Sequence, residues 1–465
     1  MRKQFKHQNR YVTGIRWLIP AGGLLLCLTL IFHHCRFYQV AELPERRMAT
    51  KIAIQWNQLA LDLERHTMGY RPPVSARMFA YVEMAAYEAS LPDLPDHISL
   101  EKFITGYQKP PEKFGTGQFS LPASVNAAYA RILRHFFATA PKKILNEVDL
   151  LEQHFHHKLI AHSPDTVISK SVAFGQKAAE TVWEWSKTDK EGHNGHLYNY
   201  DHGYESPACV GCWQPSGDLA TPALLPYWGR VRPFIPEVTD ISIKEPLSYN
   251  PQPGSDFYTE AMEVFSVSQP LSKENLWIAE FWSDDHPGLT SSPAARWISI
   301  ANQALEKSEA PFPVVIETYL KSGIALHDAG ITVWRGKYCY NLERPIAYIR
   351  KYINTEWETL HTTPSFPSYP SGHAAFGAAV AEVLTDALGT HFELVDRTHE
   401  KRQEFAGTPR SYNSFDEMAR ENAASRVLLG VHYRMDCEEG VRLGKIIGKK
   451  AVELQLSRKE AALIF

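Results

Sequence analysis

The sequence predicts an all-α fold. Helix start signals precede several apolar segments with helical periodicity, and no alternating strand pattern is longer than a few residues. Aromatic residues make up 12% of the 465-residue chain, which predicts a well-filled core and cavities lined by aromatic rings. A net charge of −3 argues against a dedicated nucleic-acid-binding protein, but it leaves room for a small basic pocket. A mean hydropathy of −0.30 is too polar for many membrane spans.

The first element is an apolar segment from Trp17 to Phe32, about 16 residues without a charge, which is short for a membrane span of ~20 residues. Five basic residues precede it, a layout typical of a secretory signal or a signal anchor. A buried N-terminal helix is the alternative. Because basic flanks stay in the cytoplasm, we expect the rest of the chain to be exported. We therefore expect residues 1–40 to be a signal peptide or membrane anchor and residues 41–465 to form a helical domain.

The helices follow in order. Residues 75–89 and 124–137 combine helical periodicity with small residues that permit close packing. Ser163 and Ser292 each precede a proline, so each is expected to cap a helix whose first residue is that proline. The later predictions are a helix from Ser371 that ends at Gly389, and a helix with a Ser414/Glu417 capping box that ends at Gly430.

Residues 190–255 are rich in Gly, Pro, Asn and Tyr, which predicts a long ordered loop that separates two helical halves or covers a site. Cys209 and Cys212 form a CxxC pair within it. That pair is consistent with a local disulfide, with two structural thiols, or with a metal site that includes upstream histidines (His193, His196 and His202). Cys339 and Cys437 are isolated in the sequence, and their pairing stays open.

The chemically informative residues lie in the last third of the chain. Ser371 is expected to cap the helix that follows it, with Gly372 and His373 in the first turn. Free N–H groups and the helix dipole at such a terminus attract an anion, and glycine lets an oxyanion approach the backbone. The plain alternative is a capped helix without a ligand.

Three cations accompany this helix start. Lys337 and Arg344 are seven residues apart, which places them on one face if that stretch is helical, although Pro345 favours a helix boundary there. Arg426 lies within the helix that Ser414 caps. Any one of them alone would be interpreted as a surface cation. Together with the anion site they predict a pocket for a tetrahedral oxyanion.

His432 and Asp436 are expected on one face of the next helix, since they are four residues apart. A carboxylate bound to one ring nitrogen fixes the tautomer and raises the basicity of the other nitrogen. This pair prepares His432 as a nucleophile or as a metal ligand. The alternative is a surface pair of little consequence.

Together the three clusters read K-x6-RP, PSGH and SR-x5-H-x3-D. The sequence thereby resembles the superfamily of type 2 phosphatidic acid phosphatases and vanadium-dependent haloperoxidases. The resemblance implies two four-helix bundles with long loops, and an anion or vanadate site in the C-terminal half, at about 255–465. It also implies the residues that hold the oxyanion: Lys337, Arg344, Ser371, Gly372, His373 and Arg426.

Further positions resemble the haloperoxidase branch, in particular its bacterial members, which are often exported. Trp334 matches an aromatic residue of the vanadate pocket, and Phe366 matches a phenylalanine of chloro- and iodoperoxidases. The stretch around Trp282 implies that Asp285, with Asp284 as the alternative, supports the last arginine. The resemblance therefore implies export to the periplasm or to the outer surface of a bacterial inner membrane.

The implied reaction oxidises a halide with hydrogen peroxide to hypohalous acid, which halogenates a small organic acceptor. His432 would bind the vanadium of vanadate, His373 would accept a proton, Lys337 would polarise the peroxide, and Asp436 would support His432. Iodide and bromide are favoured over chloride. Two alternatives stay open: an exported acid phosphatase that works through a phosphohistidine at His432, and an oxyanion-binding protein without catalysis. The oligomeric state stays open.

Overall fold

The computed structural model describes residues 42–110, 114–215, 221–268, 270–286, 289–400 and 407–458. The chain divides into two units, 1–43 and 44–465, and the description below concerns the second unit. The predicted apolar segment 17–32 lies outside the described residues. Among the helices of the described ranges, none combines the length and the hydrophobicity that a bilayer crossing requires.

The prediction of a mainly helical fold is confirmed. The described ranges contain two small antiparallel sheets, β1 (Tyr200–Asp201) with β2 (Ala223–Leu224) and β3 (Leu394–Asp396) with β4 (Arg410–Tyr412). The helices are α2 (Pro44–His66), α3 (Pro72–Ser90), α4 (Leu121–Phe136), α5 (Lys142–Ile160), α6 (Asp165–Lys187), α7 (Asp256–Ser268), α8 (Lys273–Phe281), α9 (Pro293–Ser308), α10 (Phe312–Tyr340), α11 (Pro345–Tyr352), α12 (Gly372–Leu388), α13 (Phe415–Leu428) and α14 (Arg434–Val452).

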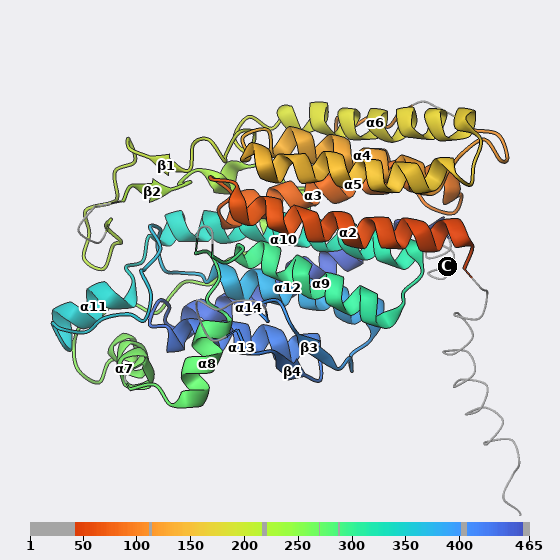
Figure 1. The fold of residues 1–465 in the computed structure, drawn as a ribbon. Coiled ribbons are helices and arrows are strands. Elements are labelled where there is room, and N and C mark those ends of the chain that lie inside the picture. Colours follow the sequence, from red (N-terminus) through yellow and green to blue (C-terminus); the bar gives the residue numbers. More distant parts are fainter. Residues whose placement is uncertain are drawn as a thin grey trace, which may run out of the picture. The chain divides into compact units, whose positions relative to one another are not determined.

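The helices of this unit pack in two groups (Figure 1). Helices α2 to α6 contact one another in the upper part of the view, and α9, α10, α12, α13 and α14 contact one another below them. The 29-residue helix α10 joins the groups, because it packs against α3 on one side and against α12 and α14 on the other. The division into two four-helix bundles stays a prediction.

The predicted N-caps Ser292, Ser371 and Ser414 are confirmed, whereas the Ser163 cap and the Glu417 half of the capping box need correction. The hydroxyls of Ser292 and Ser414 each accept a backbone N–H from the first turn of their helix. Ser163 does not cap α6, because Pro164 occupies the N-cap position in an extended conformation. The Ser414/Glu417 capping box is incomplete, because the Glu417 carboxylate accepts the N–H of Asn413, one residue before the cap.

The ends of α12 and α13 differ. Gly430 follows α13 with a φ of 79°, the positive φ that was predicted there. Gly389 ends α12 with φ 100° and ψ 161°, so it has a positive φ but lies outside the left-handed helical region that was predicted.

Helix α14 lies close to α12 because three glycines face it. A Cβ atom at Gly440, Gly444 or Gly448 would lie 2.5, 2.3 or 2.4 Å from a backbone carbonyl oxygen of α12 or its N-cap. This approach brings Asp436 beside the start of α12, where the Ser371 N–H donates to the Asp436 carbonyl at 2.9 Å. The glycines of one helix therefore position the N-terminus of the other.

The segment between α6 and α7 is the predicted long loop, and it contains β1, β2 and a Cys209–Cys212 disulfide. Both sulfurs are used in that bond, so the alternatives of two free thiols and of a mixed cysteine–histidine metal site are excluded. Cys339 is exposed and Cys437 is buried, and both are free thiols, so they are not paired with each other.

Candidate active site

A cavity of about 350 Å³ lies at the N-terminus of α12. Side chains from both helix groups line it. The predicted residues Trp334, Phe366, Gly372, His373, Arg426 and His432 are joined there by residues that carry no recognisable motif, among them Arg71, Tyr200, His286 and His361. The fold thus gathers residues that are up to about 360 positions apart in the chain around one space.

The start of α12 presents the backbone of Gly372 to this cavity. Ser371 is the N-cap, and its hydroxyl accepts the N–H of Ala374 at 3.5 Å. A Cβ at Gly372 would meet no atom closer than 3.6 Å, so packing within the protein does not require glycine there. The missing side chain leaves space in front of a helix N-terminus, which is where an oxyanion is held.

Lys337 and Arg344 do not share a helical face, because the helix boundary that Pro345 favoured lies between them. Helix α10 ends at Asn341, which has a left-handed φ of 48°, and Arg344 is the N-cap of α11. Both cations instead converge on the segment 366–368. Lys337 Nζ donates to the carbonyls of Pro367 and Ser368 at 2.9 and 2.7 Å, and Arg344 Nε donates to the Phe366 carbonyl at 2.9 Å.

Arg426 is held at the last turn of α13 by a hydrogen bond from Nη1 to the Trp282 carbonyl at 2.8 Å. The two candidate acids beside it have separate partners. Asp285 pairs with Arg71 at 2.9 Å, whereas Asp284 lies 3.8 Å from Arg296. The charge of Asp284 raises the pKa of Arg426 more than the charge of Asp285 does.

Two guanidinium donors at the pocket, Arg344 Nη2 and Arg426 Nε, are buried without a hydrogen-bond partner, and so is the ring nitrogen Nε2 of His373. Burial lowers the pKa of Arg344 to about 9 and that of Arg426 to about 10, and it lowers the pKa of Lys337 well below its usual value. Buried, unpaired cations are costly. A tetrahedral oxyanion such as vanadate or phosphate would supply the missing acceptors and charge, so the residues present fit such a group.

His432 precedes α14, whose N-cap is Tyr433, so the expectation of a shared helix face is corrected. The contact with Asp436 forms at the helix start instead, with Nδ1 and Oδ2 2.8 Å apart. The same Oδ2 accepts the Tyr433 N–H at 3.1 Å and the Ser368 hydroxyl. These bonds hold the carboxylate where it accepts the Nδ1 proton of His432.

The other ring nitrogen of His432 carries a lone pair. Nε2 lies 3.1 Å from Arg344 Nη1, which is only a donor, so Nε2 is the acceptor and Nδ1 carries the proton. Burial, followed by the charges of Arg344 and Lys337, lowers the pKa of His432 well below its usual value. A neutral imidazole with an unprotonated Nε2 is suited to bind a metal or to act as a nucleophile, once a ligand replaces the Arg344 contact.

His373 lies in the first turn of α12 and lines the same cavity as His432. Burial is the main cause that lowers its pKa well below the usual value, and the charges of Arg426, Lys337 and Arg344 lower it further. The ring is therefore neutral at neutral pH and able to accept a proton. An anion in the pocket would offset the cations and raise this pKa.

The aromatic ring of Phe366 packs against the cationic groups of Lys337 and Arg344. Its ring centroid lies 5.0 Å from Lys337 Nζ and 4.8 Å from Arg344 Cζ, and its ring contacts that of Trp334 at 5.1 Å. The Trp334 Nε1–H donates to the Leu224 carbonyl at 3.3 Å, which ties the pocket wall to strand β2.

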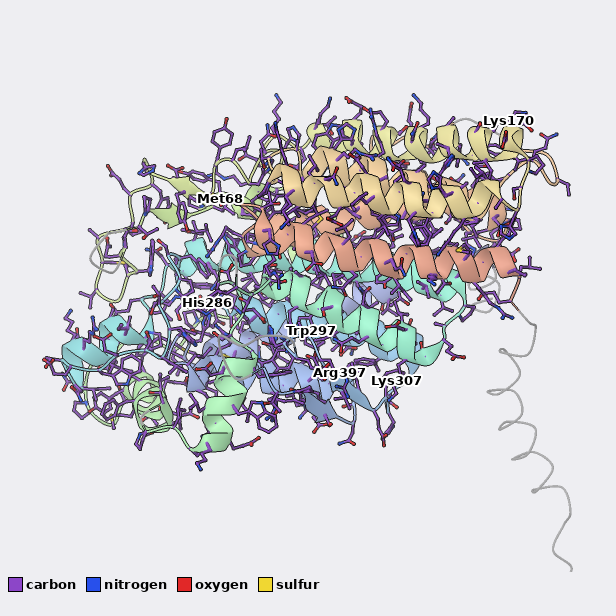
Figure 2. All side chains as sticks on the ribbon, in the orientation of Figure 1. Met68, Lys170, His286, Trp297, Lys307 and Arg397 are labelled. Atoms are coloured by element: carbon purple, nitrogen blue, oxygen red, sulfur yellow. A yellow bond between two sulfur atoms is a disulfide. The ribbon has the colours of Figure 1, made fainter. Side chains whose placement is uncertain are left out.

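Some lining residues were not found from the sequence. His286 lies in the connection between α8 and α9, in the region labelled in Figure 2, and its ring contacts that of His361 at 4.8 Å. Ser368 lies inside the PSYPSGH segment, but nothing local indicated its bond to Asp436. Arg71 and Tyr200 come from segments far from the motifs, so only the fold could reveal them.

Fold and site together define a helical protein with a buried pocket for a tetrahedral oxyanion and a histidine nitrogen beside it. The family model "VCPO second helical-bundle domain" matches residues 317–459. The vanadium chloroperoxidase of Curvularia inaequalis is 26% identical over an alignment that covers 34% of this chain and 35% of that protein. The alignment thus spans about a third of that curated relative.

Two solved structures of bacterial vanadium-dependent haloperoxidases are similar to this chain. The structure described as the first bacterial vanadium-dependent iodoperoxidase is 28% identical, with a TM-score of 0.77, and the match covers 87% of this chain and 96% of that one. A holo-type bacterial vanadium-dependent chloroperoxidase is 18% identical, with a TM-score of 0.63 over 84% of this chain and 93% of that one, and it shows the shared fold. The matched domain, the curated relative and the solved structures all support the resemblance of this chain to the vanadium haloperoxidase superfamily.

Proposed function

We propose that this protein is a vanadate-dependent haloperoxidase that oxidises a halide with hydrogen peroxide to hypohalous acid. The observation that carries the proposal is that His432 and Arg426 line one cavity, with Arg344 3.1 Å from His432 Nε2 and with unpaired donors on both arginines. A neutral nitrogen ligand together with cationic donors is the combination that a metal oxyanion needs, and the similarity to an iodoperoxidase supports the same activity.

The residues divide the work of holding vanadate. Lys337, Arg344 and Arg426 would neutralise its oxygens, and the Gly372 N–H and the Ser371 hydroxyl would donate to them at the start of α12. His432 would provide the nitrogen for vanadium, because the bond from Nδ1 to Asp436 keeps Nε2 deprotonated.

Bound vanadate supplies a Lewis-acidic centre that activates hydrogen peroxide toward a halide. His373 accepts a proton at its neutral imidazole, because burial and the nearby cations keep its pKa low. Lys337 uses two of its three N–H bonds on carbonyls and keeps one donor for an oxygen in the pocket. Buried aromatic rings of Trp334 and Phe366 limit water at the wall.

Iodide and bromide are the halides that we propose, with a small organic acceptor downstream. Phe366 presents an apolar, polarisable ring beside two cations, which suits a large, weakly hydrated anion. The iodoperoxidase match supports this preference. We also propose export to the periplasm or to the outer surface of a bacterial inner membrane, supported by the Cys209–Cys212 disulfide, a bond typical of oxidising compartments.

A phosphatase function has one specific observation in its favour. A lone pair at His432 Nε2, opposite a proton held by Asp436, is also the arrangement of a nucleophilic histidine. In that reaction His432 attacks phosphorus, and His373 protonates the leaving alcohol. Because vanadate and phosphate share charge and shape, the pocket accepts either one.

The test incubates purified protein with hydrogen peroxide and iodide, with and without vanadate, and follows triiodide. We expect vanadate-dependent oxidation that is lost in His432→Ala and retained in Lys170→Ala, a control on the exposed surface of α6 that Figure 2 labels. Vanadate binding is followed in parallel by vanadium NMR. Hydrolysis of a phosphate monoester that vanadate inhibits, without iodide oxidation, would establish the phosphatase instead.

A further inference from the structure

A second cavity of about 470 Å³ adjoins the active-site cavity. The two cavities share three lining residues, which are Arg71, Tyr200 and Asp285. Arg71 and Asp285 form an ion pair at 2.9 Å. The exposed Met68, labelled in Figure 2 just beyond the end of α2, lines the outer cavity. Tyr200 thus stands at the junction between the catalytic pocket and the space beyond it.

Strand pairing with Leu224, which bonds to the active-site wall, places the backbone of Tyr200. In the β1–β2 pair Tyr200 lies opposite Leu224. The Leu224 carbonyl accepts the Trp334 Nε1–H at 3.3 Å, and the Leu224 N–H donates to the Ser365 carbonyl at 2.9 Å. Trp334 and Ser365 both line the catalytic cavity, so Tyr200 is held at its rim by the same strand that contacts its wall.

Tyr200 is also the most accessible electron-rich ring of the described cavity lining. Its exposed fraction is 41%, whereas that of Trp334 is 1%. Among the described residues around the catalytic cavity there is no cysteine, no methionine and no second tyrosine. A phenol activates its ring carbons toward electrophilic halogen, so this side chain is the exposed phenol of the described lining that an oxidant leaving the pocket can reach.

We propose that Tyr200 is a self-halogenation site, modified on its ring by the hypohalous acid that the enzyme produces. This inference rests on the proposed function. A ring carbon ortho to the hydroxyl forms the carbon–halogen bond as the oxygen–halogen bond breaks. The ring gives up one proton, the departing hydroxide takes it, and water leaves. The halogen gains two electrons that the ring carbon loses, so the step needs no further reagent. Phenols are accordingly the class of organic acceptor that fits this junction.

Tyr198 provides a matched internal control. It lies two residues earlier and has an exposed fraction of 74%, yet it lines neither of the two cavities. Oxidant in bulk solution should therefore label Tyr198 more than Tyr200, because exposure decides the rate. Oxidant released from the pocket should label Tyr200 more than Tyr198, because position decides it.

The experiment runs the vanadate-loaded enzyme with hydrogen peroxide and iodide, without an added acceptor. Fragmentation of the peptide that contains both tyrosines then locates each iodine. A parallel sample without peroxide receives iodine from outside. We expect Tyr200 to exceed Tyr198 severalfold during turnover and the ratio to reverse with added iodine. Tyr198→Phe should keep the label at Tyr200, and Tyr200→Phe should not transfer it to Tyr198.

Iodide oxidation with the same labelling ratio in both samples, or with Tyr198 labelled more, would overturn the proposal while leaving the peroxidase function intact. Added phenol should compete with the label at Tyr200, and an undiminished label at excess phenol would contradict the assignment of phenols to this junction. If no iodide is oxidised at all, the proposed function fails, and the self-halogenation fails with it.

Discussion

Arg344 bonds to the protein backbone and also keeps a hydrogen-bond donor for a ligand. Its guanidinium donates to the carbonyls of Phe366 and Val431, approaches His432 Nε2, and keeps Nη2 without a partner. The bonds to carbonyls fix the plane of the group, so the unpaired Nη2 is already oriented before a ligand arrives. A lysine could supply the charge but not the planar arrangement of donors.

Removing that donor should weaken oxyanion binding. A hydrogen bond to a charged group contributes about 1.5–3 kcal/mol, so we expect Arg344→Gln to reduce vanadate affinity by roughly 10- to 100-fold. Calorimetric titration measures the affinity, and thermal unfolding without vanadate reports any loss of folding. Arg397→Gln, on the exposed surface, is the control and should bind as the wild type does. An affinity within twofold of wild type for Arg344→Gln would contradict this role.

At the scale of elements, the packing of α14 on α12 decides where the site residues meet. The three glycines of α14 bring its backbone against the carbonyls of α12. Asp436 precedes this contact on α14, and Ser371 caps α12, so the same approach sets the distance between the oxyanion site and the support of His432. Site geometry therefore depends on residues that contact no ligand.

A larger residue at the centre of this contact should destabilise the protein. In Gly444→Val the Cβ would lie 2.3 Å from the Ala375 carbonyl oxygen, so the helices must separate. We expect a loss in free energy of unfolding of about 1–3 kcal/mol or more, measured by urea denaturation. Lys449→Val places the same side chain at an exposed position of α14 and controls for helix propensity. Equal losses in the two variants would show that close packing is not the cause.

At the scale of the whole molecule, buried carboxyls make stability depend on pH. Glu83 is buried between helices, where the Tyr129 hydroxyl donates to it at 2.7 Å. Burial is the main cause that raises its pKa to about 8, and the hydrogen bonds of Tyr129 and Asn57 lower it in part. The folded state therefore binds the Glu83 proton more tightly than the unfolded state does.

The sign of the effect follows from that shift. The contribution of protonated Glu83 is complete below the ordinary pKa of 4.5 and is lost as the pH rises through about 8. We expect the free energy of unfolding of the wild type to fall more steeply between pH 5 and 9 than that of Glu83→Gln, as measured by urea denaturation. Glu147→Gln, at an exposed position of α5, should follow the wild type. Parallel curves for wild type and Glu83→Gln would contradict the shift.

Much of the helical fold could be predicted from the sequence, because a helix start is encoded within a few residues. Ser292 and Ser414 cap their helices as expected, since the cap and its N–H partner lie three residues apart. The motif spacings likewise named residues that the structure brings to one cavity, such as His373, Arg426 and His432. Periodicity did not distinguish the helix face from the helix start for His432 and Asp436.

The sequence by itself determined the helical class, the long loop and the identity of the cationic and histidine residues, because those signals are local. Only the tertiary structure decided that Lys337 and Arg344 both bind the segment 366–368, that Asp285 pairs with Arg71, and that Tyr200 stands at the cavity rim. The physical reason is that such contacts join residues far apart in the chain. Their geometry depends on how whole helices pack, and no pattern of neighbouring residues encodes it.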